Sequence, residues 1–86
     1  MRITFSQDAW SDFALLQADR HLVKRLNQLL ADISRDAYTG IGRPEQLRGD
    51  LAGFWSRRLD DRHRLVYRVT ADTIEIIQCQ GHYGDH

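Results

Sequence analysis

Residue types that bind phosphate and transfer protons gather in the second half of this 86-residue sequence. Between positions 43 and 68 there are four acidic residues and seven arginines: Arg43, Arg48, Arg57, Arg58, Arg62, Arg64 and Arg68. Trp and Tyr side chains are interspersed among them. A guanidinium-rich surface with aromatic side chains is typical of proteins that bind phosphates and bases. Glu45 near the start of this stretch and His82 after it are residue types that can exchange protons.

The overall charge conceals this concentration of cations. The chain has 12 basic and 12 acidic residues and a formal net charge of zero. Residues 1–42 carry five charges of each sign, whereas residues 69–86 carry three acids and no Lys or Arg. We therefore expect the excess positive charge to lie on one local surface.

Length and composition favour a single folded domain over residues 1–86. An apolar content of 42% argues against intrinsic disorder. Cys79 is the only cysteine, so the chain can form neither an internal disulfide nor a thiol metal cluster. The N-terminus lacks the apolar core of a signal peptide, and no apolar run is long enough to span a membrane. The sequence therefore predicts a cytoplasmic protein.

The hydrophobic pattern predicts an α+β fold with the order βααβββ. A first strand over residues 2–5 is followed by two helices that begin at the N-cap candidates Ser6 and Asp19. Glycines and the single proline then break the helical pattern. Three strands are expected at about 53–59, 62–69 and 73–80, with tight turns at residues 60–61 and 71–72. We expect an antiparallel-rich sheet with both helices on one face.

Strand alternation divides the arginines between the two faces of this sheet. On the last-but-one strand, Leu65 and Tyr67 point to one side, whereas Arg64 and Arg68 point to the other. On the preceding strand, Arg58 lies on the arginine side and its neighbour Arg57 faces the opposite way. The sequence therefore predicts an open, arginine-lined face with the helices behind it.

Six side chains from different elements can converge on that face: Glu45, Arg48, Arg58, Arg64, His82 and Tyr83. Each has an ordinary structural alternative when taken alone. Glu45 could be a solvated turn residue, Arg58 and Arg64 could pair with nearby aspartates, and His82 and Tyr83 could be exposed residues near the end of the chain. The four-residue spacing of His82 and His86 has no third ligand to make a metal site, so no metal or cofactor is expected.

Four sequence blocks together resemble one family. They are Gly42-Arg-Pro-Glu-Gln-Leu-Arg48, Leu51-Ala-Gly-Phe-Trp-Ser-Arg-Arg58, His63-Arg-Leu-Val-Tyr67 and Cys79-Gln-Gly-His-Tyr83. They look like the YoeB/Txe group of bacterial toxins, within the RelE-like superfamily, and the similarity covers nearly the whole chain. The extension Gly84-Asp-His86 and an arginine at position 48, where the family often has lysine, depart from the family pattern.

The resemblance implies an endoribonuclease that cleaves mRNA on the 70S ribosome and is neutralised by a YefM-type antitoxin. A second copy of the chain is a further candidate partner. By family motif, Glu45 stands at the general-base position and His82 at the general-acid position. Arg64 and Arg58 stand where the family contacts the scissile phosphate, and Arg48 and Tyr83 stand at substrate-binding positions.

The residue types suit this chemistry without a metal. Cleavage of RNA by its own 2′-hydroxyl needs a base, an acid for the leaving oxygen, and fixed cations for the extra negative charge. Two other functions stay open. One is a toxin of the same fold that acts only by binding a protein, and the other is a non-catalytic RNA- or ribosome-binding module.

Overall fold

The order of the elements agrees with the α+β expectation, with one short strand added. The computed structural model describes residues 1–79. Its helices and strands are β1 (Arg2–Phe5), α1 (Gln7–Leu16), α2 (Arg20–Arg35), β2 (Glu45–Gln46), a 3-10 turn (Gly49–Leu51), β3 (Trp55–Arg58), β4 (Arg64–Thr70) and β5 (Thr73–Gln78). The two-residue strand β2 is the addition, because the expected order βααβββ has no strand between the second helix and the strand at about 53–59.

Both helices begin at the capping residues that the sequence predicted. The Ser6 hydroxyl accepts a hydrogen bond from the Ala9 N–H at 3.1 Å. The Asp19 carboxylate accepts from the N–H groups of His21 and Leu22 at 3.0 and 3.2 Å. These contacts satisfy amide donors that have no partner inside the helix, which fixes where each helix starts.

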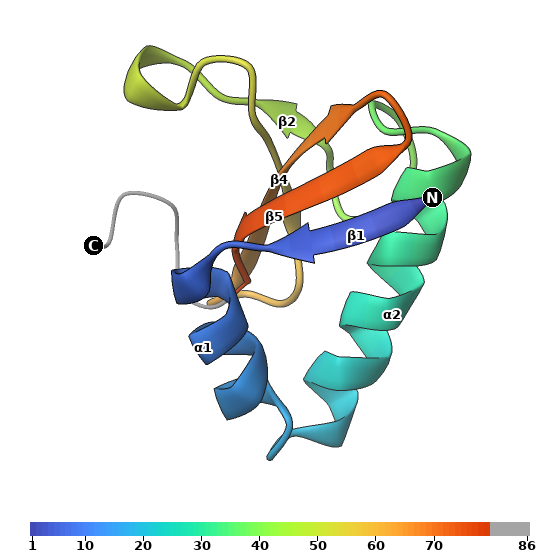
Figure 1. The fold of residues 1–86 in the computed structure, drawn as a ribbon. Helices are drawn as coiled ribbons and strands as arrows, with labels where there is room; N and C mark the ends of the chain where they lie inside the picture. Colours follow the sequence, from blue (N-terminus) through green and yellow to red (C-terminus); the bar gives the residue numbers. More distant parts are fainter. Residues whose placement is uncertain (80–86) are drawn as a thin grey trace.

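The sheet of the described chain has the strand order β1-β5-β4-β3-β2. β1 runs parallel to β5, and the other neighbouring strands are antiparallel. Both helices lie between β1 and the other strands in the sequence, and both pack against the same face of the sheet (Figure 1). The antiparallel-rich sheet with helices on one face is as the sequence predicted.

The core lies between the helices and that face of the sheet. From the helices it contains Leu26, Leu29 and Ile33, and from the sheet it contains Leu65, Tyr67, Ile74 and Ile76, all at most 1% exposed. The pairing of Tyr67 with Ile76 and of Val69 with Ile74 places these sheet residues on the same side. Burial of this apolar surface is the main force that holds the two layers together.

The connection between β3 and β4 is longer than the expected two-residue turn. β3 ends at Arg58 and β4 begins at Arg64. Within the connection, an oxygen of Asp60 accepts hydrogen bonds from the N–H groups of Arg62 and His63 at 2.8 and 2.7 Å. Asp60 therefore stabilises the backbone of the turn, a role that Asp commonly has in turns.

Arg57 lies on the helix side of β3, as alternation predicted, and its side chain is completely buried. All of its N–H directions meet an acceptor. Nε donates to the Tyr67 hydroxyl at 3.1 Å, and Nη1 donates to the Asp32 carboxylate at 2.5 Å. The remaining donors reach, at 2.8–3.1 Å, the carbonyl oxygens of Asp36, Thr39 and Ile41. Arg57 thus ties the segment after α2 to the sheet.

Shifted pKa values keep Asp32 ionised and Tyr67 neutral beside the charged Arg57. The hydrogen bond from Arg57 is the main cause that lowers the pKa of Asp32 to about 2, with the Ile41 N–H and Arg35 adding to it. Burial raises the pKa of Tyr67, so its hydroxyl stays protonated and donates to the Ala37 carbonyl at 2.6 Å. The network therefore joins a carboxylate, a guanidinium and a neutral phenol.

Gly40 allows the loop to approach this network closely. Its φ of +124° is unfavourable for other residues, and a Cβ at this position would lie 1.9 Å from the Asp32 carboxylate. A side chain here would push the loop away from Asp32 and Arg57.

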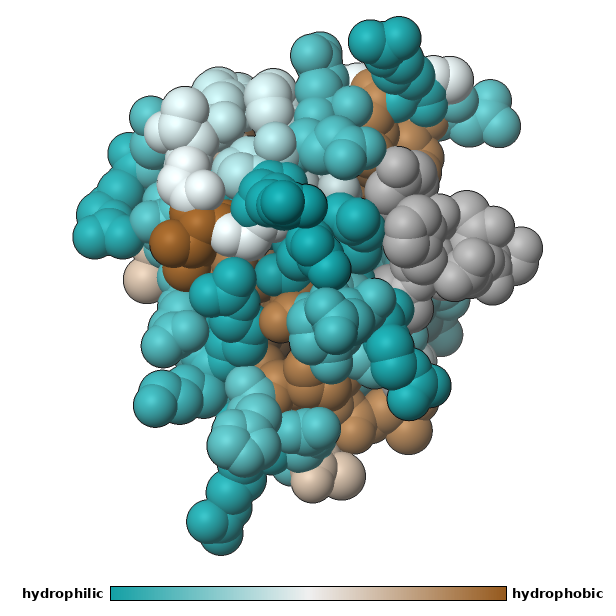
Figure 2. Space-filling model, turned by 180° about the vertical axis from the view of Figure 1, so that it is seen from behind, coloured by the Kyte–Doolittle hydropathy of each residue, from teal (hydrophilic) through white to brown (hydrophobic). Residues whose placement is uncertain are grey.

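The outside of the molecule is predominantly polar on the side opposite to the view of Figure 1. Figure 2 shows hydrophilic side chains over most of that side, with apolar surface in limited areas. Within residues 1–79, none of the helices is long and apolar enough to cross a membrane.

Replacing Arg57 with Met should destabilise the fold strongly. The change keeps an unbranched side chain but leaves three loop carbonyls without their donor and Asp32 without its buried cation. We expect the melting temperature to fall by about 10 °C or more. The matched change Arg62→Met, at an exposed position, should shift it by less than about 3 °C. Similar losses in the two variants, measured by circular dichroism, would contradict the role of Arg57.

The lowered pKa of Asp32 predicts a loss of stability in acid. A depressed folded-state pKa gives stabilisation that is complete above the ordinary value of 3.8 and is lost as the pH falls toward about 2. In urea titrations, Asp32→Asn should therefore be much less stable than the parent at neutral pH. The gap between them should narrow below about pH 4. A gap that stays constant down to pH 2.5 would show that Asp32 does not titrate as described.

Candidate functional site

The register of the sheet places three of the predicted site residues on one face. Glu45 of β2 lies opposite Ser56 of β3, and two residues further along β3, Arg58 lies opposite Arg64 of β4. Directly paired residues, and residues two apart on a strand, point to the same side. Glu45, Arg58 and Arg64 therefore share the face opposite the helices, which we call the outer face.

Glu45 reaches this position because the preceding loop is anchored to β3. The Gly42 carbonyl accepts a hydrogen bond from the Arg58 N–H at 2.6 Å, and the Leu47 N–H donates to the Phe54 carbonyl at 2.9 Å. These bonds lie on either side of Glu45 and hold β2 against β3. Because Arg57 binds the carbonyls of the same loop a few residues earlier, the buried arginine helps to position the exposed carboxylate.

Arg48 follows Glu45 along the edge of the sheet. Both side chains are exposed, and both line an open groove of about 480 Å³ together with Gln46 and Leu47. In Figure 1, β2 and the 3-10 turn that follows it extend away from the helices. Glu45 and Arg48 therefore place a carboxylate and a guanidinium on the lining of one solvent-accessible groove.

Arg58 lies at the end of β3 with its side chain about one third exposed. Its Nη2 contacts the Asp61 carboxylate at 3.2 Å, and the Asp61 side chain is 97% exposed. The ordinary pairing of Arg58 with a nearby aspartate, which the sequence left open, is thus present. An ion pair this exposed contributes little to stability, so a stronger anionic ligand can replace it.

Arg68 shares the outer face but has structural partners on it. Its guanidinium lies 4.7 Å from the centre of the Phe54 ring and donates to Glu75 at 2.7 Å. Thr70 donates to the same carboxylate at 2.8 Å. The Arg68 hydrogen bond is the main cause that lowers the pKa of Glu75. Arg68 is therefore engaged in pairing β4 with β5.

Two features near Glu45 were not identified from the sequence. One is the anchoring role of Arg57, although its inward position on an alternating strand was a usable signal. The other is Ser56, directly opposite Glu45, which is completely buried. Its hydroxyl has no hydrogen-bond partner within the part of the chain that the structure describes. A serine in a strand gives no sequence signal for such a position.

The remaining predicted site residues, His82 and Tyr83, lie outside the described residues, as does His86. In the part that is described, no group of three or more His, Cys, Asp or Glu side chains is arranged to hold a metal ion. Burial raises the pKa of the Cys79 thiol to about 12, so this buried side chain is neutral at physiological pH. Cys79 is therefore poorly suited to act as a thiolate nucleophile.

Sequence and structure comparisons give one family. Residues 5–83 match the model of the YoeB-like toxin of bacterial type II toxin–antitoxin systems. Toxin YoeB of Streptomyces coelicolor is 52% identical over 96% of this chain and 100% of its own length.

Two solved structures from Staphylococcus aureus are similar throughout. The toxin chain in a heterotetrameric YoeB–YefM toxin–antitoxin complex is 44% identical, with a TM-score of 0.89, over 96% of this chain and 98% of its own. A YoeB dimer is 45% identical, with a TM-score of 0.90 and the same coverage. With its outer-face carboxylate and arginines, this chain belongs to the YoeB-like toxins of bacterial type II toxin–antitoxin systems.

Proposed function

We propose that the protein is a ribosome-dependent mRNA endoribonuclease that cleaves translated message in the ribosomal A site. The observation that carries this proposal is the shared outer face of Glu45, Arg58 and Arg64, with Arg48 beside Glu45 on the same sheet edge. A proton acceptor within reach of several fixed cations is what cleavage at an RNA phosphate requires.

The proposed reaction is an internal transfer within the RNA. Glu45 accepts the proton of the 2′-hydroxyl, and the 2′-oxygen forms a bond to the adjacent phosphorus. The bond from phosphorus to the 5′-oxygen breaks, and His82 donates a proton to that leaving oxygen. The products are a 2′,3′-cyclic phosphate and a free 5′-hydroxyl, so the step needs no oxidant, metal or external nucleophile.

The arginines stabilise the phosphorane between these two proton transfers. Arg58 and Arg64 are a directly opposed cross-strand pair, so two guanidinium groups project from neighbouring positions of the outer face. Guanidinium donors form charge-assisted hydrogen bonds to phosphate oxygens, which strengthen as negative charge develops. By family motif, Arg48 and Tyr83 would bind the substrate RNA.

The exposure of the site supports dependence on the ribosome. Glu45 and Arg48 are exposed at the sheet edge, so the protein by itself offers few walls to align a flexible RNA. In-line attack by the 2′-oxygen needs a fixed geometry, and a partner that holds the message supplies it. Translating ribosomes would provide that partner in the cytoplasm.

We further propose that a YefM-type antitoxin controls this activity. The supporting observation is the similarity to the toxin chain of the Staphylococcus aureus complex over nearly the whole chain. An acidic segment of the antitoxin would complement the arginines of the outer face. Self-association of the free toxin is a second proposal, supported by the similar dimeric toxin from the same organism.

Replacing Glu45 with Gln should remove the base while keeping the shape of the side chain. We expect cleavage of ribosome-bound mRNA to slow by about 10²- to 10⁴-fold, with little change in ribosome binding or melting temperature. His82→Ala should give the same separation of cleavage from binding. Asp50→Asn, an equal change of charge on the same projecting segment, is the control. Unchanged cleavage in both site variants would contradict the roles of Glu45 as base and His82 as acid, whereas no cleavage by the parent protein would favour a toxin that acts by binding alone.

The internal attack can be tested on the substrate itself. A message carrying a single 2′-deoxynucleotide immediately before the cut should resist cleavage at that bond, while a deoxynucleotide several positions away should have no effect. Mapping of the cut sites on programmed ribosomes gives both results. Efficient cleavage at the 2′-deoxy position would rule out attack by the 2′-oxygen.

A further inference from the structure

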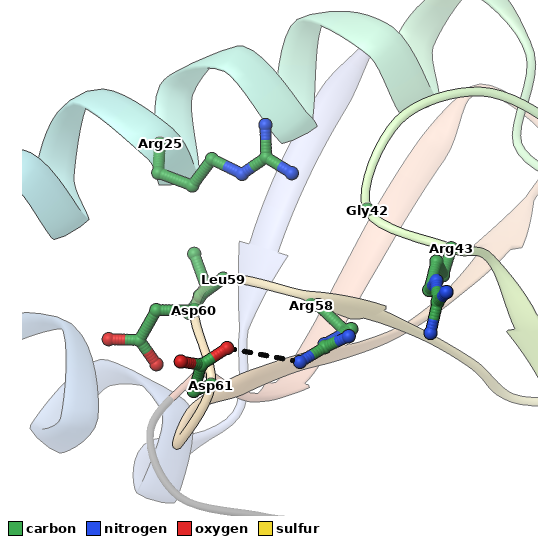
Figure 3. Close-up of a pocket in the computed structure, with 7 residues that line it drawn as sticks. All are labelled: Arg25, Gly42, Arg43, Arg58, Leu59, Asp60 and Asp61. Carbon is green, nitrogen blue, oxygen red and sulfur yellow. Dashed lines mark hydrogen bonds and ion pairs between the residues drawn. The ribbon is translucent and has the colours of Figure 1, made fainter.

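A second group of arginines surrounds a depression at the end of β3. Its lining, with a volume of about 310 Å³, combines side chains from α2, the loop before β2 and the β3–β4 connection: Arg25, Gly42, Arg43, Arg58, Leu59, Asp60 and Asp61. Figure 3 shows Arg25 projecting from α2 and Arg58 lying between Arg43 and Asp61. Three guanidinium groups from three separate segments thus border one hollow.

Two of these arginines lack partners that would explain their position. Within residues 1–79, the side chains of Arg25 and Arg43 form no hydrogen bond or ion pair. Arg25 is nevertheless half-buried. Several arginines around one depression, two of them without an anionic partner within residues 1–79, suit a site whose anion comes from a ligand.

Arg43 also occupies a backbone conformation that suits glycine better than arginine. Its φ is +54°, in the left-handed region. The backbone of this arginine is therefore strained. Gly40 and Gly42 in the same loop also have positive φ values, which glycine adopts without strain. Strain of this kind is concentrated at functional positions.

The two carboxylates in the depression do not cancel this charge equally. The Asp60 carboxylate accepts hydrogen bonds from the backbone N–H groups of Arg62 and His63, which fix it within the turn. Asp61 contacts only Arg58 among the lining residues in Figure 3, and its side chain is almost fully exposed. It can therefore swing away when another anion approaches Arg58.

We propose that this depression binds a backbone phosphate of RNA next to the phosphate that is cleaved. The inference rests on the proposed function, because Arg58 would serve both phosphates and so link the depression to the outer face. Arg25 and Arg43 would contact the neighbouring phosphate, and Asp61 would release Arg58 as RNA binds. The hollow is large enough for a phosphate group with part of its sugar.

The test measures binding of an uncleavable, 2′-deoxy-substituted RNA to the protein by fluorescence anisotropy over a range of salt concentrations. Arg25→Gln and Arg43→Gly should each weaken binding roughly three- to tenfold and reduce the salt dependence by about one phosphate contact. Arg43→Gly suits the positive φ, so it should not destabilise the fold. Asp61→Asn should strengthen binding, because Arg58 loses its competing carboxylate.

Lys24→Gln is the matched control, since Lys24 is exposed on α2 next to Arg25 and does not line the depression. If Arg25→Gln and Arg43→Gly bind RNA no more weakly than Lys24→Gln, the proposal is wrong. It is equally wrong if these two variants lose affinity only for an acidic antitoxin peptide, because the ligand would then be a protein.

Two further measurements show whether the phosphate belongs to mRNA or to ribosomal RNA, and whether phosphate binding is independent of cleavage. The same variants are tested on ribosomes with and without message. A loss confined to ribosomes carrying message assigns the phosphate to mRNA, whereas an equal loss on vacant ribosomes assigns it to ribosomal RNA and overturns a position next to the cut. If the parent protein binds RNA through Arg25 and Arg43 but does not cleave it, the proposed function fails while the phosphate site stands.

Discussion

The buried guanidinium of Arg57 holds α2, the loop after it and the sheet in one arrangement. A charged side chain with no exposure is unfavourable unless every donor is satisfied and an opposite charge is close. Arg57 meets both conditions through Asp32, the Tyr67 hydroxyl and three loop carbonyls. Since these partners come from α2, β4 and the loop after α2, one side chain joins three parts of the fold.

The consequences of this network extend to the outer face. With its carbonyls bound to Arg57, the loop passes close to Asp32 at Gly40, and its Gly42 carbonyl then accepts a hydrogen bond from the Arg58 N–H of β3. The chain thereby arrives at the sheet edge in register, with Glu45 opposite Ser56. The position of an exposed carboxylate is thus set by a buried ion pair on the other side of the sheet.

The arginine-rich segment serves several purposes with one residue type. Arg57 holds the fold together, and Arg68 links β4 to β5 through Glu75 and Phe54. Within residues 1–79, the Arg58 side chain pairs only with the exposed Asp61, and it projects from the end of its strand. The difference between structural and ligand-binding arginines here is the number and burial of their partners, which net charge does not reveal.

Local sequence patterns were sufficient to predict the helices, the three long strands and the division of the arginines between two faces. These follow from local rules: Ser6 and Asp19 cap helices, apolar residues repeat with helical spacing, and neighbours on a strand point in opposite directions, as Arg57 and Arg58 do. The family resemblance, carried by short motifs, was also readable from the sequence and is confirmed by the comparisons.

The packed fold was needed to establish the strand order, the register that places Glu45 opposite Ser56, and the depression lined by Arg25, Arg43 and Arg58. Arg25 lies far from Arg58 in the sequence, and no periodicity links a helix position to a strand end. β2 is two residues long, which is too short to give a periodic signal. It forms because the anchored loop before it places these residues beside β3. Contacts between distant segments depend on packing, which local sequence patterns do not encode.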